Sequence, residues 1–192
     1  MAFARLRGVS LAATLALVMA LPTGAPVAAA TPARVVDAEA YALSLLNCTR
    51  TGGWVKRDGT CKNRGSGKHS AKRKPLPMHQ GISRKVAWPF ARALVQANVC
   101  GHVIAGQPAL SGRMRTAGFR HHYFGENVGC GWGGGSPAQV VLETHLAMQA
   151  EKRVKGGHWR NIKNAKYRSV GIGVATRNGT TMVVWDFYGK RP

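Results

Sequence analysis

The chain has 192 residues, of which 28 are Lys or Arg and only 7 are Asp or Glu, so its formal net charge at pH 7 is +21. Its length suits one globular domain with a substantial core and excludes a second large domain once the N-terminal segment is removed. The charge predicts salt-sensitive attraction to polyanions, although a basic surface that only keeps the protein soluble is an equal alternative.

Residues 1–30 have the features of a secretory signal peptide. Arg5 and Arg7 give a positive start, residues 9–21 are apolar, and residues 28–30 are small enough for cleavage. The apolar run is too short to span a bilayer, and the cleavage region has no cysteine for a lipid anchor. We therefore expect a secreted, extracellular protein with no transmembrane segment in the mature chain.

A first helix is predicted over residues 37–46, where apolar residues recur at helical spacing behind an acidic start, and it should end near Asn47. Residues 51–82 are rich in Gly, Pro, Lys and Arg, with eight basic side chains between residues 56 and 74 against a lone Asp58. We expect a long, mobile basic loop here. Its charge favours contact with an anionic cell-envelope polymer.

Helical periodicity returns over residues 88–100, where Pro89 suits the first turn, and the Cys-Gly pair at its end predicts the stop. A short helical turn is expected over residues 111–117, with Gly118 as its left-handed terminator. The next segment, FGENVGCG, is predicted to be a strand that leads into a glycine-rich turn.

The C-terminal third contains the clearest signals. Ser136 and Pro137 should open a helix that runs to about Arg153. Two alternating apolar runs then flank Asn178-Gly179, the pair typical of a type I′ hairpin turn. Several helices with an antiparallel sheet predict an α+β fold class.

Four cysteines in an exported chain favour two disulfides, because the compartment is oxidising. Of the three possible connectivities we favour Cys48 with Cys61, which flank one local segment, and Cys100 with Cys130, which join two later elements. A four-thiolate metal site is the weaker interpretation, since the chain has no CxxC pair.

Histidine follows glycine at two predicted element boundaries. His102 comes after Cys100-Gly101, and His158 comes after Gly156-Gly157. Together with Glu126 in the GEN motif, these residues place two imidazoles and a carboxylate where the chain leaves regular elements and can converge on a cleft.

These residues belong to a longer series of motifs. The motifs are CGH at 100–102, Arg113 with AGF at 117–119, GEN at 125–127, GGHWRNI at 156–162, Tyr167, VGIGVA at 170–175 and WDF at 185–187. The series resembles the CAP superfamily (cysteine-rich secretory protein, antigen 5 and pathogenesis-related 1), in particular the bacterial SCP-like extracellular domain. The resemblance covers about residues 37–189 of an expected domain at 31–192, and it implies a three-layer α-β-α sandwich with a central antiparallel sheet.

The resemblance also implies a cleft lined by two histidines and two acids, which in some family members holds a divalent cation such as zinc. By position these are His102, His158 and Glu126, with the two histidines as the metal ligands. Imidazole nitrogens suit zinc, and two of them predict modest affinity that falls at low pH. A hydrogen-bonded cluster that only stiffens the cleft is an equal alternative.

The second acid has two candidates on the helix before His158. We favour Glu151, three residues after Met148, and keep Glu143 as the second choice because both can face the same side of the helix. We expect His145 to be a packed or surface imidazole. Asn127 and Asn161 are expected to frame the cleft by hydrogen bonding.

The first functional hypothesis is a non-enzymatic binding or interaction protein, with lipid or an anionic envelope polymer as partner. The alternative is a zinc-assisted extracellular hydrolase of peptides or cell-wall fragments with Glu126 or Glu151 as general base, although the chain has no GxSxG or HExxH motif. A third hypothesis is a basic polyanion-binding protein. Nucleic acid is not the expected partner, because no basic helix has base-reading spacing, and the sequence predicts no oligomeric state.

Overall fold

The structure is a computed structural model that describes residues 30–119 and 122–190. The predicted signal peptide therefore lies outside the described residues, apart from its last one. Among the described helices, none has the length and apolar character needed to cross a membrane. The elements are β1 Ala33–Arg34, α1 Val36–Arg50, β2 Trp54–Val55, β3 Cys61–Lys62, α2 Gln80–Ile82, the π-helical η1 Ser83–Ala87, α3 Trp88–Ala97, α4 Leu110–Thr116, β4 His122–Gly131, α5 Pro137–Ala150, the 3-10 helix η2 Glu151–Val154, α6 Gly157–Lys163, β5 Ser169–Arg177 and β6 Thr180–Lys190.

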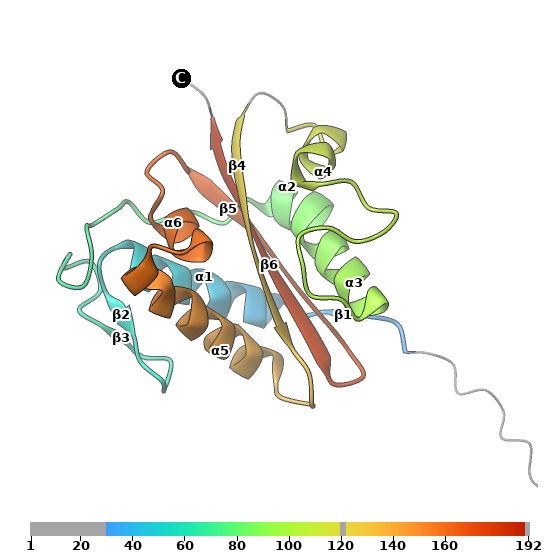
Figure 1. The fold of residues 1–192 in the computed structure, drawn as a ribbon, viewed down its shortest axis with the longest axis horizontal. Coiled ribbons are helices and arrows are strands. Elements are labelled where there is room, and N and C mark those ends of the chain that lie inside the picture. Colours follow the sequence, from blue (N-terminus) through green and yellow to red (C-terminus); the bar gives the residue numbers. More distant parts are fainter. Residues whose placement is uncertain (1–29, 120–121, 191–192) are drawn as a thin grey trace, which may run out of the picture.

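A four-stranded antiparallel sheet in the order β1-β5-β6-β4 forms the middle layer (Figure 1). Helices α1, α5 and α6 cover one face, and the α2, η1 and α3 unit covers the other, with α4 beside β4. The predicted α+β class and its α-β-α layering are confirmed. Strand β4 lies at the edge of the sheet, so groups from both faces can meet around it.

The hairpin between β5 and β6 forms as predicted. Asn178 and Gly179 have φ angles of 49° and 73°, which is the left-handed conformation that both central residues of a type I′ turn require. Arg177 and Thr180 pair directly across the turn. The turn therefore sets the register between β5 and β6.

Strand β5 packs differently against the two helical layers. Its large side chains, Val170, Ile172 and Val174, pack in the core cluster under α1. On the opposite face a Cβ atom at Gly173 would overlap the backbone of Trp88. The helical unit that contains α3 can thus lie directly on the strand backbone.

The helical unit formed by α2, η1 and α3 differs at both ends from the helix predicted over residues 88–100. It begins at Gln80, ahead of the predicted start, because the His79 imidazole accepts a hydrogen bond from the Ile82 backbone N–H and caps the first turn. It ends at Asn98, whose φ of 53° is left-handed, rather than at Cys100. Histidine and asparagine at these ends are weaker sequence signals than the expected Pro and Gly.

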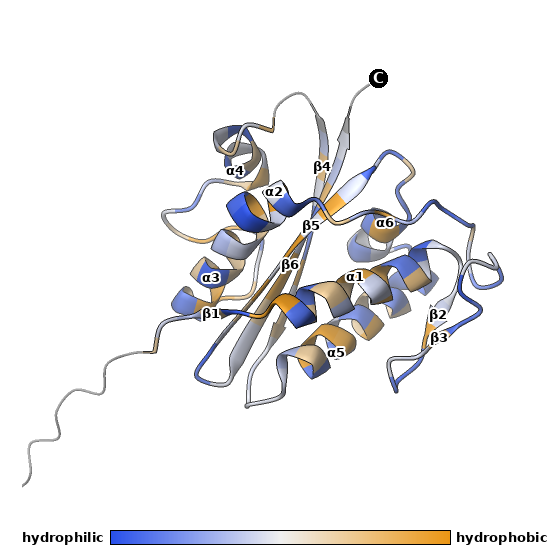
Figure 2. Cartoon of the chain, turned by 180° about the vertical axis from the view of Figure 1, so that it is seen from behind, coloured by the Kyte–Doolittle hydropathy of each residue, from blue (hydrophilic) through white to orange (hydrophobic). Residues whose placement is uncertain are grey.

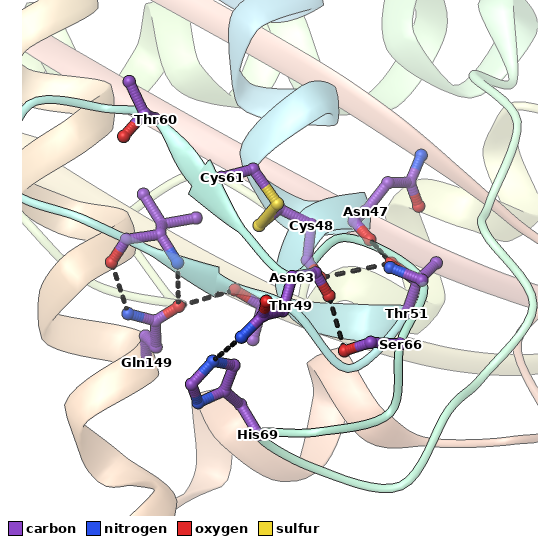
Figure 3. Close-up of a disulfide and its surroundings, with 12 residues drawn as sticks. Asn47, Cys48, Thr49, Thr51, Thr60, Cys61, Asn63, Ser66, His69 and Gln149 are labelled. Carbon is purple, nitrogen blue, oxygen red and sulfur yellow. Dashed lines mark hydrogen bonds between the residues drawn. A yellow bond between two sulfur atoms is a disulfide. The ribbon is translucent and has the colours of Figure 1, made fainter.

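The predicted loop 51–82 is more structured than expected. Strands β2 and β3 pair within it, and the Cys48–Cys61 disulfide fastens β3 to α1 (Figure 3). The side-chain amide of Gln149 accepts from the Val55 N–H and donates to the Val55 carbonyl, both at 2.9 Å. The segment between β3 and α2 is strongly hydrophilic (Figure 2). The start of the loop 51–82, which contains β2 and β3, is nevertheless held by α1 and α5.

Both predicted disulfides are confirmed. The Cα atoms of Cys48 and Cys61 are 5.9 Å apart, and those of Cys100 and Cys130 are 6.0 Å apart. The second disulfide ties the segment just before His102 to strand β4, and so to the strand that contains Glu126.

Candidate functional site

The site is arranged around the edge strand β4, whose successive side chains point to opposite faces of the sheet. Glu126 points to the layer of α3 and α4, where it meets Arg113 of α4. Asn127 points to the layer of α5 and α6, where its Nδ2 donates to Met148 Sδ at 3.4 Å and to the His158 carbonyl at 3.3 Å. One strand therefore connects both halves of the site.

The first half of the site is a buried carboxylate with two partners, an imidazole and a guanidinium group. Glu126 Oε1 accepts from His102 Nδ1 at 2.9 Å, and Glu126 Oε2 accepts from the Arg113 guanidinium. The Glu126 and Arg113 side chains are 4% and 7% exposed, whereas His102 is 54% exposed. Arg113 also lies over the Phe90 ring, 3.5 Å from its centre. Arg113 had no predicted role, because no spacing rule links a helix to a distant strand.

The second half is centred on Glu151. Its Oε1 accepts from His158 Nδ1 at 2.5 Å, and its Oε2 accepts from the backbone N–H groups of His158 at 3.0 Å and Trp159 at 3.4 Å. Burial raises the pKa of Glu151, but the hydrogen bond and charge of His158 together with the backbone donors outweigh it, so the pKa lies below its usual value. Glu143 is exposed and accepts from Gln139 Nε2 at 2.9 Å instead.

The two histidines approach each other across the edge of the sheet. The ring centres of His102 and His158 are 6.5 Å apart with the planes inclined by 31°. Because each Nδ1 lies against a carboxylate, we assign the proton to Nδ1, which leaves a lone pair on each Nε2. Within the described residues no hydrogen bond involves either Nε2.

This donor set fits a divalent cation in part. A carboxylate on Nδ1 with a free Nε2 is the usual arrangement of histidine ligands to metals. Among the described residues, however, no group of three or more His, Cys, Asp or Glu side chains is placed to hold an ion. A cation here would therefore have His102 and His158 as its protein ligands, with solvent or a bound molecule completing the shell.

A cavity of about 380 Å³ adjoins the second half of the site. Its lining includes His158, Glu151, Glu143, Trp132 and the Cys100–Cys130 disulfide. The volume falls within the range of small-molecule sites, and the lining combines apolar surface with a few polar groups. The cavity thus has the size of a small-molecule site and adjoins His158.

Two asparagines frame the site in the way expected from the sequence. Asn161 Nδ2 donates to the Glu126 carbonyl at 3.1 Å and to Asn127 Oδ1 at 2.8 Å. The Tyr167 hydroxyl in turn donates to Asn161 Oδ1 at 3.2 Å. This chain of hydrogen bonds joins α6 to β4 and fixes the position of the His158 backbone.

A third carboxyl group lies beneath the first half of the site. Asp186 of β6 is the register partner of Glu126, is fully buried, and neither of its carboxyl oxygens has a hydrogen-bond partner among the described residues. Burial raises the pKa of Asp186 well above its usual value, and the charge of Glu126 raises it further, while Arg113 opposes both. Its signal in the sequence is an acid inside the apolar run of β6.

His145 is not part of the site. It is fully buried on α5, and its Nε2 shares a 2.8 Å hydrogen bond with Thr49 Oγ1. Burial lowers the pKa of His145 to about 3, so the ring is neutral at physiological pH. The expectation of a packed imidazole agrees with this position.

Comparison with known proteins gives a limited result. No family model matches the sequence, and no curated protein matches it. The structure is similar to an extracellular protein containing an SCP domain from Bacillus anthracis, with 17% sequence identity and a TM-score of 0.48. The likeness covers 62% of this chain and 35% of that one, so this chain spans about a third of that protein. A likeness of this extent carries no conclusion about this chain, and function has to come from the geometry of the site.

Proposed function

We propose that the protein is a secreted, non-enzymatic binding protein of the SCP-like type, with a cleft that holds a divalent cation such as zinc. The observation that carries this proposal is the pairing of each imidazole with its own carboxylate, with the two rings 6.5 Å apart beside the cavity. The cation would be bound by Nε2 of His102 and Nε2 of His158.

The residues that support the two histidines have separate tasks in this proposal. Glu126 and Glu151 hold the two rings with Nε2 directed away from the carboxylates. Arg113 balances the buried charge of Glu126. A bound zinc ion would supply positive charge that attracts and orients an oxygen atom of a further ligand.

The hydrogen bonds of the two carboxylates favour binding over hydrolysis. A general base needs a basic oxygen within reach of the proton it removes. Glu126 already accepts from Arg113 and His102, and Glu151 accepts from three donors, which lower its pKa. Both carboxylates are therefore weak candidates for the base of a hydrolase.

The partner and location are proposed on more general grounds. Two disulfides fit an oxidising compartment outside the cytoplasm. The cavity beside His158 suits a small organic ligand or part of a lipid, and the high positive charge of the chain suits the anionic envelope. We propose that the protein acts close to the cell surface from which it is exported.

Calorimetric titration with zinc chloride tests the cleft. The metal-free protein should bind one zinc ion per chain, and His102→Gln and His158→Gln should each weaken binding at least tenfold. His69→Gln is the matched control, because His69 contacts Asn63 and Trp54 away from the cleft. Equal zinc heats in all four proteins would overturn the proposal.

Two further measurements refine the test. Zinc affinity should decrease as the pH is lowered from 7.5 to 5.5, because protons compete for the imidazole nitrogens. Hydrolysis of peptides or cell-wall fragments that stops on addition of a chelator would show an enzyme instead, and would contradict the non-enzymatic part of the proposal.

A further inference from the structure

A second cavity, of about 440 Å³, lies on the same side of the sheet but at the opposite end of α6 from His158. Five cationic residues line it, together with Leu76 and Tyr167. We call it the basic pocket, and its cations are Arg50, Lys72, Arg73, Lys74 and Arg168. It shares no lining residue with the cavity beside His158.

No carboxylate balances these five cations. Within the described part of the chain, none of the ion pairs includes any of them. The carboxylates that form ion pairs have other cations as partners. These carboxylates are Glu39, Asp58, Glu126 and Glu151. The pocket therefore concentrates positive charge that the protein itself leaves uncompensated.

Arg50 is the fixed centre of the basic pocket. Although it is only 2% exposed, it has carbonyl groups and no carboxylate as partners. Its guanidinium donates to the carbonyls of Lys74 at 2.8 Å, Ile162 at 2.7 Å and Asn164 at 3.0 Å. Arg50 thus joins α1 to two other chain segments around the cavity, and burying its charge without a counter-ion is unfavourable in the absence of a ligand.

Lys163 adds a sixth cation next to the pocket. Its Nζ donates to the carbonyls of Thr49 at 3.1 Å and Arg50 at 2.8 Å and to Ser70 Oγ at 2.8 Å. Burial, followed by the charges of Arg50 and Arg73, lowers the pKa of Lys163 to about 8. Burial, followed by the charges of Arg73 and Arg168, likewise lowers the pKa of Arg50 to about 10. In both groups burial is the larger cause, and the neighbouring cations add to it.

The outer cations keep donors available for a ligand. Lys72 and Lys74 are exposed, and neither side chain makes a hydrogen bond in the described structure. Arg73 uses only its Nε, towards the Lys163 carbonyl, and Arg168 uses only Nη1. Two guanidinium groups and two ammonium groups therefore face the cavity or its rim with free N–H groups.

We propose that the basic pocket binds a chain of phosphate groups. Guanidinium forks match the paired oxygens of a phosphate, and lysine ammonium groups add charge without demanding one geometry. Five cations around one cavity call for a ligand with several negative charges. The ligand is either inorganic polyphosphate or an envelope polymer joined by phosphodiester links. This site is independent of the proposed cation cleft.

Calorimetric titrations of the purified protein at about 0.15 M salt test this site, with sodium tripolyphosphate and poly(glycerol phosphate) as separate probes. The pocket variant is Lys72→Gln/Arg73→Gln/Lys74→Gln. The control variant is Arg57→Gln/Lys62→Gln/Arg64→Gln, which removes the same charge from exposed positions of the same basic segment outside the pocket.

The proposal predicts binding of at least one probe, a loss of tenfold or more in the pocket variant, and a change of less than threefold in the control variant. The probe that binds more tightly identifies the source of the phosphate chain. Equal losses in the two variants would show a general effect of net charge, and no binding of either probe to the unmodified protein would exclude the site. Either result would overturn the proposal and would leave the zinc titration unaffected.

Discussion

The proposed cation cleft and the basic pocket lie at opposite ends of α6 and differ in how their charges are balanced. At the first end His158 is paired with Glu151, and across β4 the charge of Glu126 is balanced by Arg113. At the other end Arg50 and Lys163 have carbonyl groups as partners, with further cations around them. Charges in the cleft are thus paired within the fold, whereas those in the pocket have no carboxylate partner among the described residues. Substitutions at the two ends should change stability in opposite directions.

The largest effect is expected at Arg113. Arg113→Leu should lower the free energy of unfolding by about 3–5 kcal/mol, because it leaves the buried charge of Glu126 without its partner. Urea denaturation measures the change. Arg160→Leu is the control, since Arg160 is exposed and forms no ion pair in the described structure. A loss below 1 kcal/mol in Arg113→Leu would show that the pair is not structural.

The next effect concerns the disulfide beside the cleft. The replacement Cys100→Ala/Cys130→Ala should cost roughly 3–4 kcal/mol by the loop-entropy estimate for a separation of 30 residues. It should also weaken zinc binding, because the segment before His102 is released from β4. The replacement Cys48→Ala/Cys61→Ala should destabilise the fold and leave zinc affinity within about twofold. Equal zinc affinities in both double variants would show that the Cys100–Cys130 disulfide does not position His102 for zinc binding.

A smaller effect is expected from Asp186→Asn, and its sign depends on pH. The pKa of Asp186 is raised in the folded state, so the protonated group favours folding below its unfolded value of 3.8. That stability is lost as the pH rises from 3.8 towards the raised folded value. Asparagine is neutral throughout, so the melting temperature of the variant relative to the parent should increase from pH 4 to pH 7.

Asp58→Asn provides the control for this pH dependence. Asp58 is exposed, and hydrogen bonds from the Thr60 side chain and backbone lower its pKa, so its contribution has the opposite sign. A melting temperature of Asp186→Asn that falls relative to the parent as the pH rises would mean that Asp186 is ionised in the folded protein.

The smallest effect is expected in the basic pocket itself. Without phosphate and at low salt, Lys72→Gln/Arg73→Gln/Lys74→Gln should stabilise the protein by up to about 1 kcal/mol, because repulsion between neighbouring cations is relieved. The gain should disappear at 1 M salt, and it should exceed that of the Arg57, Lys62 and Arg64 control. Destabilisation of the pocket variant would mean that these cations support the fold.

Features with a local cause could be predicted from the sequence. The Asn178-Gly179 turn, the alternation in β5 and β6 and the Ser136 cap of α5 each depend on neighbouring residues, and all three are present. The two disulfides followed from the positions of the cysteines along the chain. The convergence of His102, Glu126 and His158 was expected from a family resemblance rather than from spacing.

Features that depend on contacts between distant segments could not be predicted. Arg113 on α4 pairs with Glu126 on β4, and the periodicity of the sequence does not predict a pair between two elements. The basic pocket combines residues near 50, 72–76 and 165–168, which adjoin one another only after folding. The order within the segment 51–82 was missed for the same reason, because Gln149, far along the chain, supplies the hydrogen bonds that hold β2.

The most direct test of the two-site account is a crossed titration of zinc and tripolyphosphate, each added alone to the parent, to His102→Gln/His158→Gln and to the pocket variant. If the two sites are separate, the histidine variant should lose zinc binding and keep tripolyphosphate binding, and the pocket variant should show the reverse. Loss of both ligands in either variant, or of neither ligand in both, would contradict the existence of two separate sites.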